Sequence, residues 1–162
     1  TTVLPLERAV STRETFFYNP HNFWAYLPAR KGSEEAYYSH FSINHSGFFT
    51  TGEETKADRA FKRAYQSEYL QIELKNIGLF RRTDHVTVLG HHIITTRLSK
   101  AVAERIDALY ASGRVVEEFL PELLEICAKP GKIRFVLENN GAKAEKLRRV
   151  LARNFYFRQT EM

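Results

Sequence analysis

Seven basic side chains near the C-terminal end of the sequence are its strongest chemical signal. They lie on a predicted strand, on the helix predicted after it and just beyond that helix: Lys132, Arg134, Lys143, Lys146, Arg149, Arg153 and Arg158. Several cations on one surface neutralise phosphates and release counterions, which raises affinity for nucleic acid whatever its base sequence. We therefore expect a non-catalytic nucleic-acid-binding protein; the pattern does not distinguish DNA from RNA, or single from double strands.

The distribution of charge supports a local binding surface and also leaves an alternative open. Residues 1–128 hold 15 Lys and Arg against 16 Asp and Glu, whereas residues 129–162 hold nine against three. An excess confined to one segment is how an electrostatic surface appears in sequence. Residues 104–125, however, hold six acids against two arginines. These acidic helices could pair with the basic segment within a subunit or across a dimer, as in a protein-interaction or homo-oligomeric assembly module.

A small nuclease or nuclease-type toxin is a further alternative. Glu73-Leu74-Lys75 has the acid-x-lysine spacing of a nuclease half-site, in which a second carboxylate helps to hold Mg²⁺ near the scissile phosphate. Asp58 and Asp84 are candidate partners by sequence proximity alone, and the tripeptide falls at the end of a predicted helix. His40 or His45 could instead serve as acid and base in a metal-independent ribonuclease. Neither pattern selects catalysis, so we favour a binding role.

Cofactor and metal sites find little support in the sequence. The single cysteine, Cys127, rules out a Cys-rich zinc site and an intrachain disulfide. His91 and His92 are adjacent, so on a strand they face opposite sides of a sheet and do not readily share one metal ion. The P-loop pattern is absent. We expect no cofactor and no metal.

Aromatic residues are concentrated in the first third of the sequence. Eleven of the 21 aromatic residues lie between Phe16 and Phe49. Aromatic side chains most often fill the core of a sheet. Exposed on a sheet, they stack on bases in single-strand binders, and converging in space they can line a small-molecule pocket. The sequence favours a role in the core and leaves the other two open.

The elements that would position these residues indicate an α+β fold in one domain spanning 1–162. Helices are predicted at about 56–77, 100–128 and 142–153, on one face of a mainly antiparallel sheet built from N-terminal and central strands. Within 100–128, Gly113 is expected to end a first helix near Ser112, and a second helix is expected from about Arg114. Thr55 and Asp58 have the spacing of a capping box, which begins the first helix. Alternation over residues 38–44 predicts a half-buried strand, and residues 132–138 predict another.

The sequence also bears on the compartment. It contains no apolar run of the roughly 18 residues that a membrane span needs, and no signal-peptide pattern at its start. A near absence of cysteine is unlike small secreted domains. We therefore expect a cytoplasmic protein that does not act at a membrane.

Overall fold

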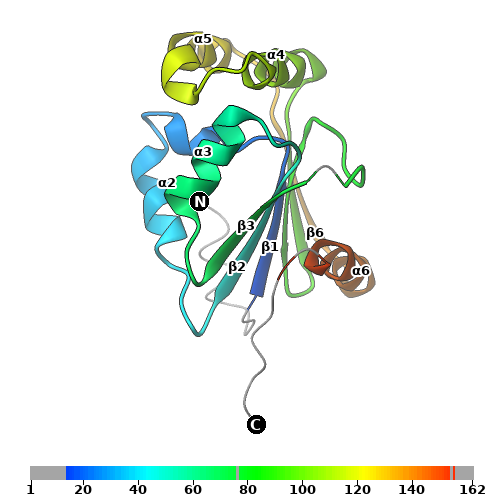
Figure 1. The fold of residues 1–162 in the computed structure, drawn as a ribbon. Coiled ribbons are helices and arrows are strands. Elements are labelled where there is room, and N and C mark those ends of the chain that lie inside the picture. Colours follow the sequence, from blue (N-terminus) through cyan, green and yellow to red (C-terminus); the bar gives the residue numbers. More distant parts are fainter. Residues whose placement is uncertain (1–13, 76, 154, 156–162) are drawn as a thin grey trace.

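The structure, a computed structural model, describes residues 14–75, 77–153 and 155. Six strands form one mixed sheet in the order β3-β2-β1-β4-β5-β6 (Figure 1). In chain order the strands are β1 (Glu14–Asn19), β2 (Ser46–Thr51), β3 (Leu70–Leu74), β4 (Asp84–Leu89), β5 (His92–Arg97) and β6 (Arg134–Asn139). The pairs β1–β2 and β2–β3 are parallel, and the other three are antiparallel. The predicted α+β class and mainly antiparallel sheet are confirmed.

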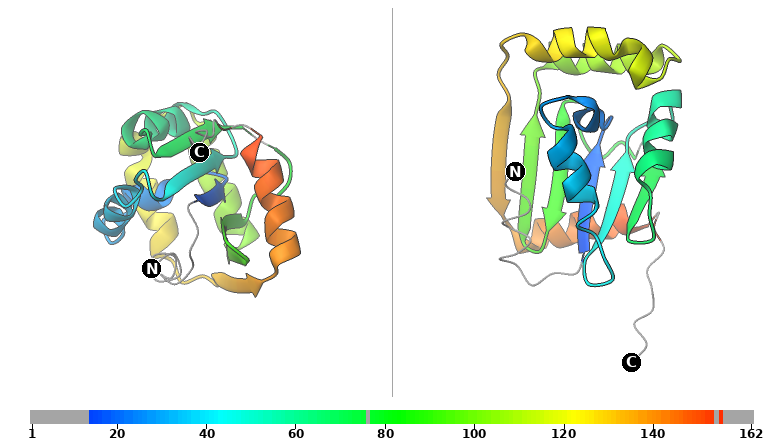
Figure 2. Two further views of the ribbon diagram at one scale, coloured as in Figure 1. Left: turned by 90° about the horizontal axis from the view of Figure 1, so that it is seen from below. Right: turned by 90° about the vertical axis from the view of Figure 1, so that its left-hand side faces the viewer.

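The helices surround the sheet on three sides. They are the short 3-10 helix η1 (Phe23–Tyr26), α2 (Lys31–Tyr38), α3 (Lys56–Tyr65), α4 (Lys100–Ala111), α5 (Val116–Ala128) and α6 (Gly141–Ala152). Helices α2 and α3 lie over one face, α6 lies on the opposite face, and α4 and α5 lie across one end (Figures 1 and 2). Among the described residues, none of the helices has the length and apolar character required to cross a membrane.

The prediction that all helices share one face is wrong, because β1 buries both of its faces. Phe17 packs with Phe49 and Phe61 under α2 and α3. Its neighbour Phe16 points the other way and packs with Ala144 and Leu151 of α6. Successive residues of a strand face opposite sides, so adjacent buried phenylalanines require a cover on each side. A third cluster joins η1 to α4 and α5 at the end of the sheet.

The predicted helix 56–77 is wrong in its second half. Helix α3 starts at the predicted capping box and ends at Tyr65, because Gln66 has extended backbone angles (φ −64°, ψ 133°). The chain then forms β3, whose Leu70 and Ile72 are buried against β2. By contrast, the predicted division of 100–128 at Gly113 is confirmed: α4 and α5 lie on either side of this residue, and its φ of +77° ends the first helix.

The strand predicted at 38–44 is also wrong. Those residues contain the end of α2 and the turn after it. Pairs four residues apart support this helix, with Arg30 contacting Glu34 and Lys31 contacting Glu35. Its Tyr37 and Tyr38 face the core. The strand predicted at 132–138 and the helix predicted at 142–153 are β6 and α6, displaced by one or two residues.

Candidate functional site

A cavity of about 580 Å³ lies between α2 and the sheet. Its aromatic lining comprises Phe17, Trp24, Tyr37, Tyr38, Phe49 and Phe135. Its polar lining comprises Asn19, Asn22, Arg30, Ser33, Glu34, His85, Thr87 and Thr96. Pockets for small ligands in proteins have about this volume and this mixture of aromatic walls with a few polar groups.

The cavity lies where the sheet changes direction. On this face α2 and α3 lie over the parallel strands, while no helix that the structure describes lies over β5 and β6 (Figure 2). The chain leaves β1 toward β2, and β4 pairs with the opposite side of β1. The carboxyl end of a parallel strand at such a switch point is the usual place for ligands in open α/β sheets. Asn19 ends β1 there, and Asn22 follows it in the loop.

A chain of polar contacts runs around the cavity and fixes its lining. Asn19 donates to Asn22 (3.3 Å), and Asn22 donates to the hydroxyl of Tyr38. That hydroxyl donates to Glu34 (2.9 Å), which also accepts a hydrogen bond from Arg30 (3.0 Å). Three elements, β1, the loop before η1 and α2, are thereby held in one arrangement. Such preorganised polar groups bind a ligand without an added ordering cost.

The contacts continue across the other side of the cavity through Trp24. The guanidinium of Arg30 lies over its indole ring, 5.4 Å from the ring centroid. The indole Nε1–H donates to Nδ1 of His85 on β4 (3.4 Å). Burial, together with repulsion from His21, lowers the pKa of His85 to about 3. His85 is therefore a neutral ring at physiological pH, and because its Nδ1 accepts a hydrogen bond, its proton is on Nε2.

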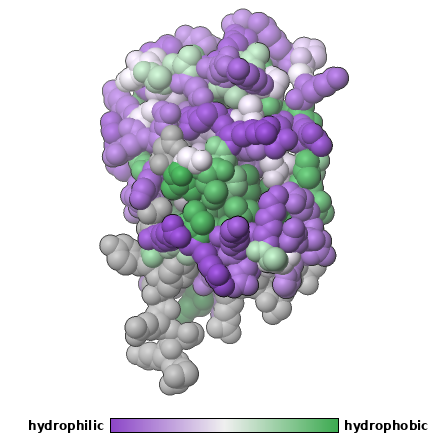
Figure 3. All heavy atoms as spheres, turned by 90° about the vertical axis from the view of Figure 1, so that its right-hand side faces the viewer, coloured by the Kyte–Doolittle hydropathy of each residue, from purple (hydrophilic) through white to green (hydrophobic). Residues whose placement is uncertain are grey.

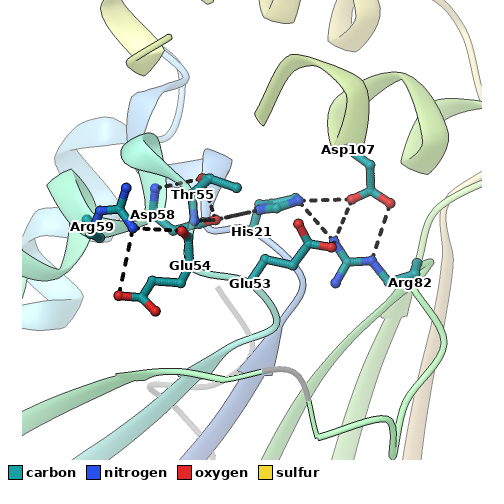
Figure 4. A network of polar contacts seen from close by, with 8 residues as sticks. All are labelled: His21, Glu53, Glu54, Thr55, Asp58, Arg59, Arg82 and Asp107. Carbon is teal, nitrogen blue, oxygen red and sulfur yellow. Dashed lines mark hydrogen bonds and ion pairs between the residues drawn. The ribbon is translucent and has the colours of Figure 1, made fainter. Parts of the chain in front are cut away.

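A buried ionic cluster next to the cavity joins the end of β1 to two helices (Figure 4). His21 is 1% exposed, with Nδ1 3.1 Å from the carboxylate of Asp58 in α3. Its Nε2 lies 3.0 Å from Oδ1 of Asp107 in α4. Arg82 donates to both oxygens of Asp107 (2.8 and 3.3 Å). The ring of His21 also stacks on Tyr110, with centroids 4.0 Å apart.

The ionic cluster holds a loop in place, and the charges around His21 stabilise this arrangement. Burial alone lowers the pKa of His21, but the hydrogen bonds to Asp107 and Asp58 outweigh it and raise the pKa above its ordinary value. The cationic ring thus bridges two carboxylates. The space beside it is only about 10 Å³, too small for a ligand. The cluster anchors the loop that carries Asn22 and Trp24 into the cavity.

No protein-family model, curated protein or solved structure matches this chain. The site is therefore interpreted from its geometry and chemistry.

The predicted basic residues fall into two groups rather than one patch. Lys132 and Arg134 lie at the α5 end of β6, whereas α6 with Lys143, Lys146 and Arg149 lies at the other end of the sheet (Figure 2). Arg153 follows α6, and Arg158 lies outside the described residues. The face that carries α6 also shows a hydrophobic area bordered by hydrophilic residues (Figure 3).

Acidic neighbours engage part of the basic set. Lys143 contacts Glu138 (2.9 Å), and Arg149 contacts Glu145 (2.8 Å). Four exposed residues have no ion-pair partner among the residues that the structure describes: Lys132, Arg134, Lys146 and Arg153.

The residues proposed for a metal-dependent nuclease are not brought together, whereas the rings of His40 and His45 lie close, with centroids 5.3 Å apart. Glu73 lies on β3, a strand, and not at the end of a helix as predicted. Asp58 is engaged by His21 and Thr55, and Asp84 accepts two hydrogen bonds from Arg97 (2.7 and 2.9 Å). His45 lies 2.6 Å from the hydroxyl of Thr15. Within the described ranges, no three His, Cys, Asp or Glu side chains converge as a metal site would require.

Sequence reasoning missed most of the cavity. Nothing in the sequence pointed to a shared site for Asn19, Asn22 and His85. The one usable signal was the run of aromatic and amide side chains directly after a buried strand. Its meaning depended on β1 being parallel to β2, which no local pattern reveals.

Proposed function

We propose that this protein is a non-catalytic binding protein whose cavity holds a neutral, planar, hydrogen-bonding ring of the nucleobase class. The observation that carries the proposal is the cavity of about 580 Å³ itself, with aromatic walls around a small set of polar groups at the sheet's switch point. Aromatic side chains stack on any base, because every base has a π face. The polar groups would then recognise the ring's edge.

The charge state of the lining favours a neutral ring over an ion. His85 is neutral, and burial together with the nearby Glu34 charge raises the pKa of Tyr38 well above its ordinary value, so its phenol stays protonated. The charges of Arg30 and Glu34 pair with each other. The other polar residues of the lining, among them His85, Thr87 and Thr96, offer a ligand uncharged hydrogen-bonding groups.

The intrinsic fluorescence of Trp24 tests this proposal directly. Trp24 is the only tryptophan of the chain and lines the cavity, so a ring that enters the cavity changes its emission. We expect saturable quenching with one or more of the four common nucleosides, with N-acetyltryptophanamide titrated in parallel to correct for absorbance. A second titration uses short single-stranded oligonucleotides and distinguishes binding of a free nucleoside from binding of a base within a polymer.

A pair of variants on one strand supplies the control. Thr96→Val removes a hydroxyl from the cavity, while Thr95→Val makes the same change on the opposite face of β5. Loss of one hydrogen bond to the ligand should weaken binding about tenfold in Thr96→Val and leave Thr95→Val unchanged. No quenching by any nucleoside or oligonucleotide, or equal effects of the two variants, would contradict the proposal.

A second candidate is the predicted binding of nucleic acid through the basic strand and helix. The observation that favours it is the set of four exposed cations without ion-pair partners among the described residues: Lys132, Arg134, Lys146 and Arg153. Such cations contact phosphates without displacing an existing partner. They could hold the backbone of a strand while the cavity holds one of its bases.

Salt-dependent binding of labelled oligonucleotides tests this second candidate. Replacing Lys146, Arg149 and Arg153 by alanine should weaken binding to all sequences alike and flatten the dependence on salt. The matched control replaces Lys100, Arg105 and Lys129, three exposed cations of the acidic end, and changes the net charge equally. Undiminished binding by the first variant would exclude this surface, whatever the result for the cavity.

A further inference from the structure

Among the strands that the structure describes, β6 forms one edge of the sheet and β3 forms the other. Three large apolar side chains stand in a row along the cavity face of β6: Ile133 just before it (59% exposed), Phe135 (52%) and Leu137 (48%). The opposite face of the same strand carries Arg134, Val136 and Glu138. An exposed apolar edge strand is a ready template for pairing with another strand, and soluble proteins usually blunt it. The strand contains neither proline nor bulge, and its charged residues, Arg134 and Glu138, lie on the face opposite the apolar row.

The backbone register shows which groups of β6 face outward. Asn140 donates its N–H to the carbonyl of His91, and the pairing of β5 with β6 continues from there in steps of one residue. In an antiparallel ladder, residues that exchange hydrogen bonds alternate with residues that do not. The even-numbered residues of β6 therefore bond to β5. The N–H and C=O groups of Phe135 and Leu137 point away from the sheet and are available to a partner.

We infer that β6 pairs with β6 of a second copy of this chain, antiparallel and centred on Val136. In this register Phe135 lies opposite the partner's Leu137, and both present outward N–H and C=O groups, so each such pair exchanges two hydrogen bonds. Val136 lies opposite its own copy. The two sheets join into one continuous sheet.

The sequence of β6 is complementary to itself in this register alone. Arg134 lies opposite the partner's Glu138, and the pair occurs twice because of the two-fold symmetry. These are non-hydrogen-bonded pairs, in which side chains approach most closely, and opposite charges there stabilise pairing. A shift by two residues would place Arg134 opposite a valine or an asparagine. The strand Arg-Phe-Val-Leu-Glu thus specifies both its partner and its register.

The rest of the fold agrees with a second copy as the occupant. Antiparallel pairing sets the start of β6, beside the acidic α5, next to the end of the partner's β6, beside its basic α6. Acidic residues Glu122 and Glu125 are exposed on α5, as is Lys146 on α6. The pairing also sets the partner's Leu137 against Phe135, which lines the cavity. Each copy then contributes an apolar side chain to the other's cavity wall.

Sedimentation equilibrium measures dimerisation of the chain, and variants that exchange the charges of Arg134 and Glu138 test the proposed pairing. We expect the unaltered chain to be a dimer. Arg134→Glu and Glu138→Arg each place like charges opposite one another twice and should weaken dimerisation by about tenfold or more. The double variant Arg134→Glu/Glu138→Arg restores opposite charges in every pair and should dimerise like the unaltered chain.

Dimerisation of the double variant would show that the single variants act on the strand pairing and not on the fold. Glu138 also contacts Lys143 within its own chain, so Lys143→Ala serves as a control and should leave the dimer intact. Phe135→Lys, which removes the apolar contact, should give a folded monomer with unaltered circular dichroism. A monomeric unaltered chain at high micromolar concentration, or a double variant no better than its parents, would overturn the inference. The Trp24 titration of Arg134→Glu, a change outside the cavity lining, reports separately on the cavity.

Discussion

His21 and His85 are both buried, yet their neighbours move their pKa values in opposite directions. His21 lies between two carboxylates, which raise its pKa above the ordinary value despite burial. For His85, attraction to Asp84 and Asp107 does not offset burial and repulsion from His21, which lower its pKa to about 3. The surroundings thus favour the protonated ring of His21 and the neutral ring of His85, and each suits its place in the ionic cluster or in the cavity.

These shifts predict that the free energy of unfolding is greatest near the ordinary histidine pKa of about 6.5. His21 binds its proton more tightly when folded, so its contribution is complete below pH 6.5 and is lost as the pH rises through its folded pKa. His85 binds its proton more weakly when folded, so stability also falls as the pH drops from about 6.5 toward 3. Urea unfolding at a series of pH values measures both the fall in stability above pH 6.5 (the alkaline limb) and the fall below it (the acidic limb).

Single substitutions separate the two limbs. His21→Gln should destabilise the protein and flatten the alkaline limb, and His85→Gln should flatten the acidic one. His91→Gln, at an exposed position, should change neither. An alkaline limb that persists in His21→Gln would show that the ionic cluster is not its source.

At the scale of elements, the start of α3 combines a local helix cap with a contact to a residue distant in sequence. Thr55 and Asp58 form the predicted capping box, with the Thr55 hydroxyl accepting from the Asp58 N–H (3.2 Å). The sequence could show this because a capping box is a pattern of four residues. It could not show that Asp58 also holds His21, which is 37 residues away.

Because Asp58 has both roles, its substitution should lower the free energy of unfolding more than substitution of Thr55, the other residue of the capping box. Thr55→Ala should lower the free energy of unfolding by about 1 kcal/mol, the usual cost of a lost N-cap. Asp58→Ala should cost roughly 3–5 kcal/mol, because it also leaves a buried charge without its partner. Ser99→Ala removes the cap of α4, which has no such link, and should behave like Thr55→Ala. Equal costs at Thr55 and Asp58 would contradict a role for His21.

Elements without a strong local pattern were the ones predicted wrongly. Helix α2 is eight residues long and is stabilised by two ion pairs and by burial of Tyr37 and Tyr38. Strand β3 was merged into the preceding helix, because Tyr69 and Ile72 also fit a helical period. By contrast, α4 and α6 carry clear periodicity and clear ends, and both were found within a residue or two.

At the scale of the molecule, the class of the fold could be predicted and its layering could not. Alternation within a strand shows which side chains share a face, and adjacent buried phenylalanines on β1 indicate two covered faces only after β1 is known to be central. The cavity draws its lining from η1, α2 and five of the six strands. No local pattern specifies such a convergence.

The opposite face depends on α6, and this gives a prediction for the whole sheet. Leu151 is 1% exposed and packs with Phe16 and Val88. Leu151→Ala should lower the free energy of unfolding by about 2–5 kcal/mol. It should also raise the rate of amide hydrogen exchange more in α6 than in α2. Arg149→Ala, on the exposed side of α6, should stay within about 0.5 kcal/mol. Uniform exchange in both helices would indicate that the two faces unfold as one unit.

The position of β1 in the sheet also has a consequence for synthesis. This central strand precedes both of its partners, and β4 begins 70 residues after β1 begins. At about 5–20 residues per second, the ribosome delivers β4 several seconds after β1. During that interval the apolar run Phe16-Phe17-Tyr18 is complete but has no antiparallel neighbour. The nascent chain is therefore most exposed to misassociation at β1, the first strand that the structure describes, and a chaperone that binds short aromatic segments would act there first.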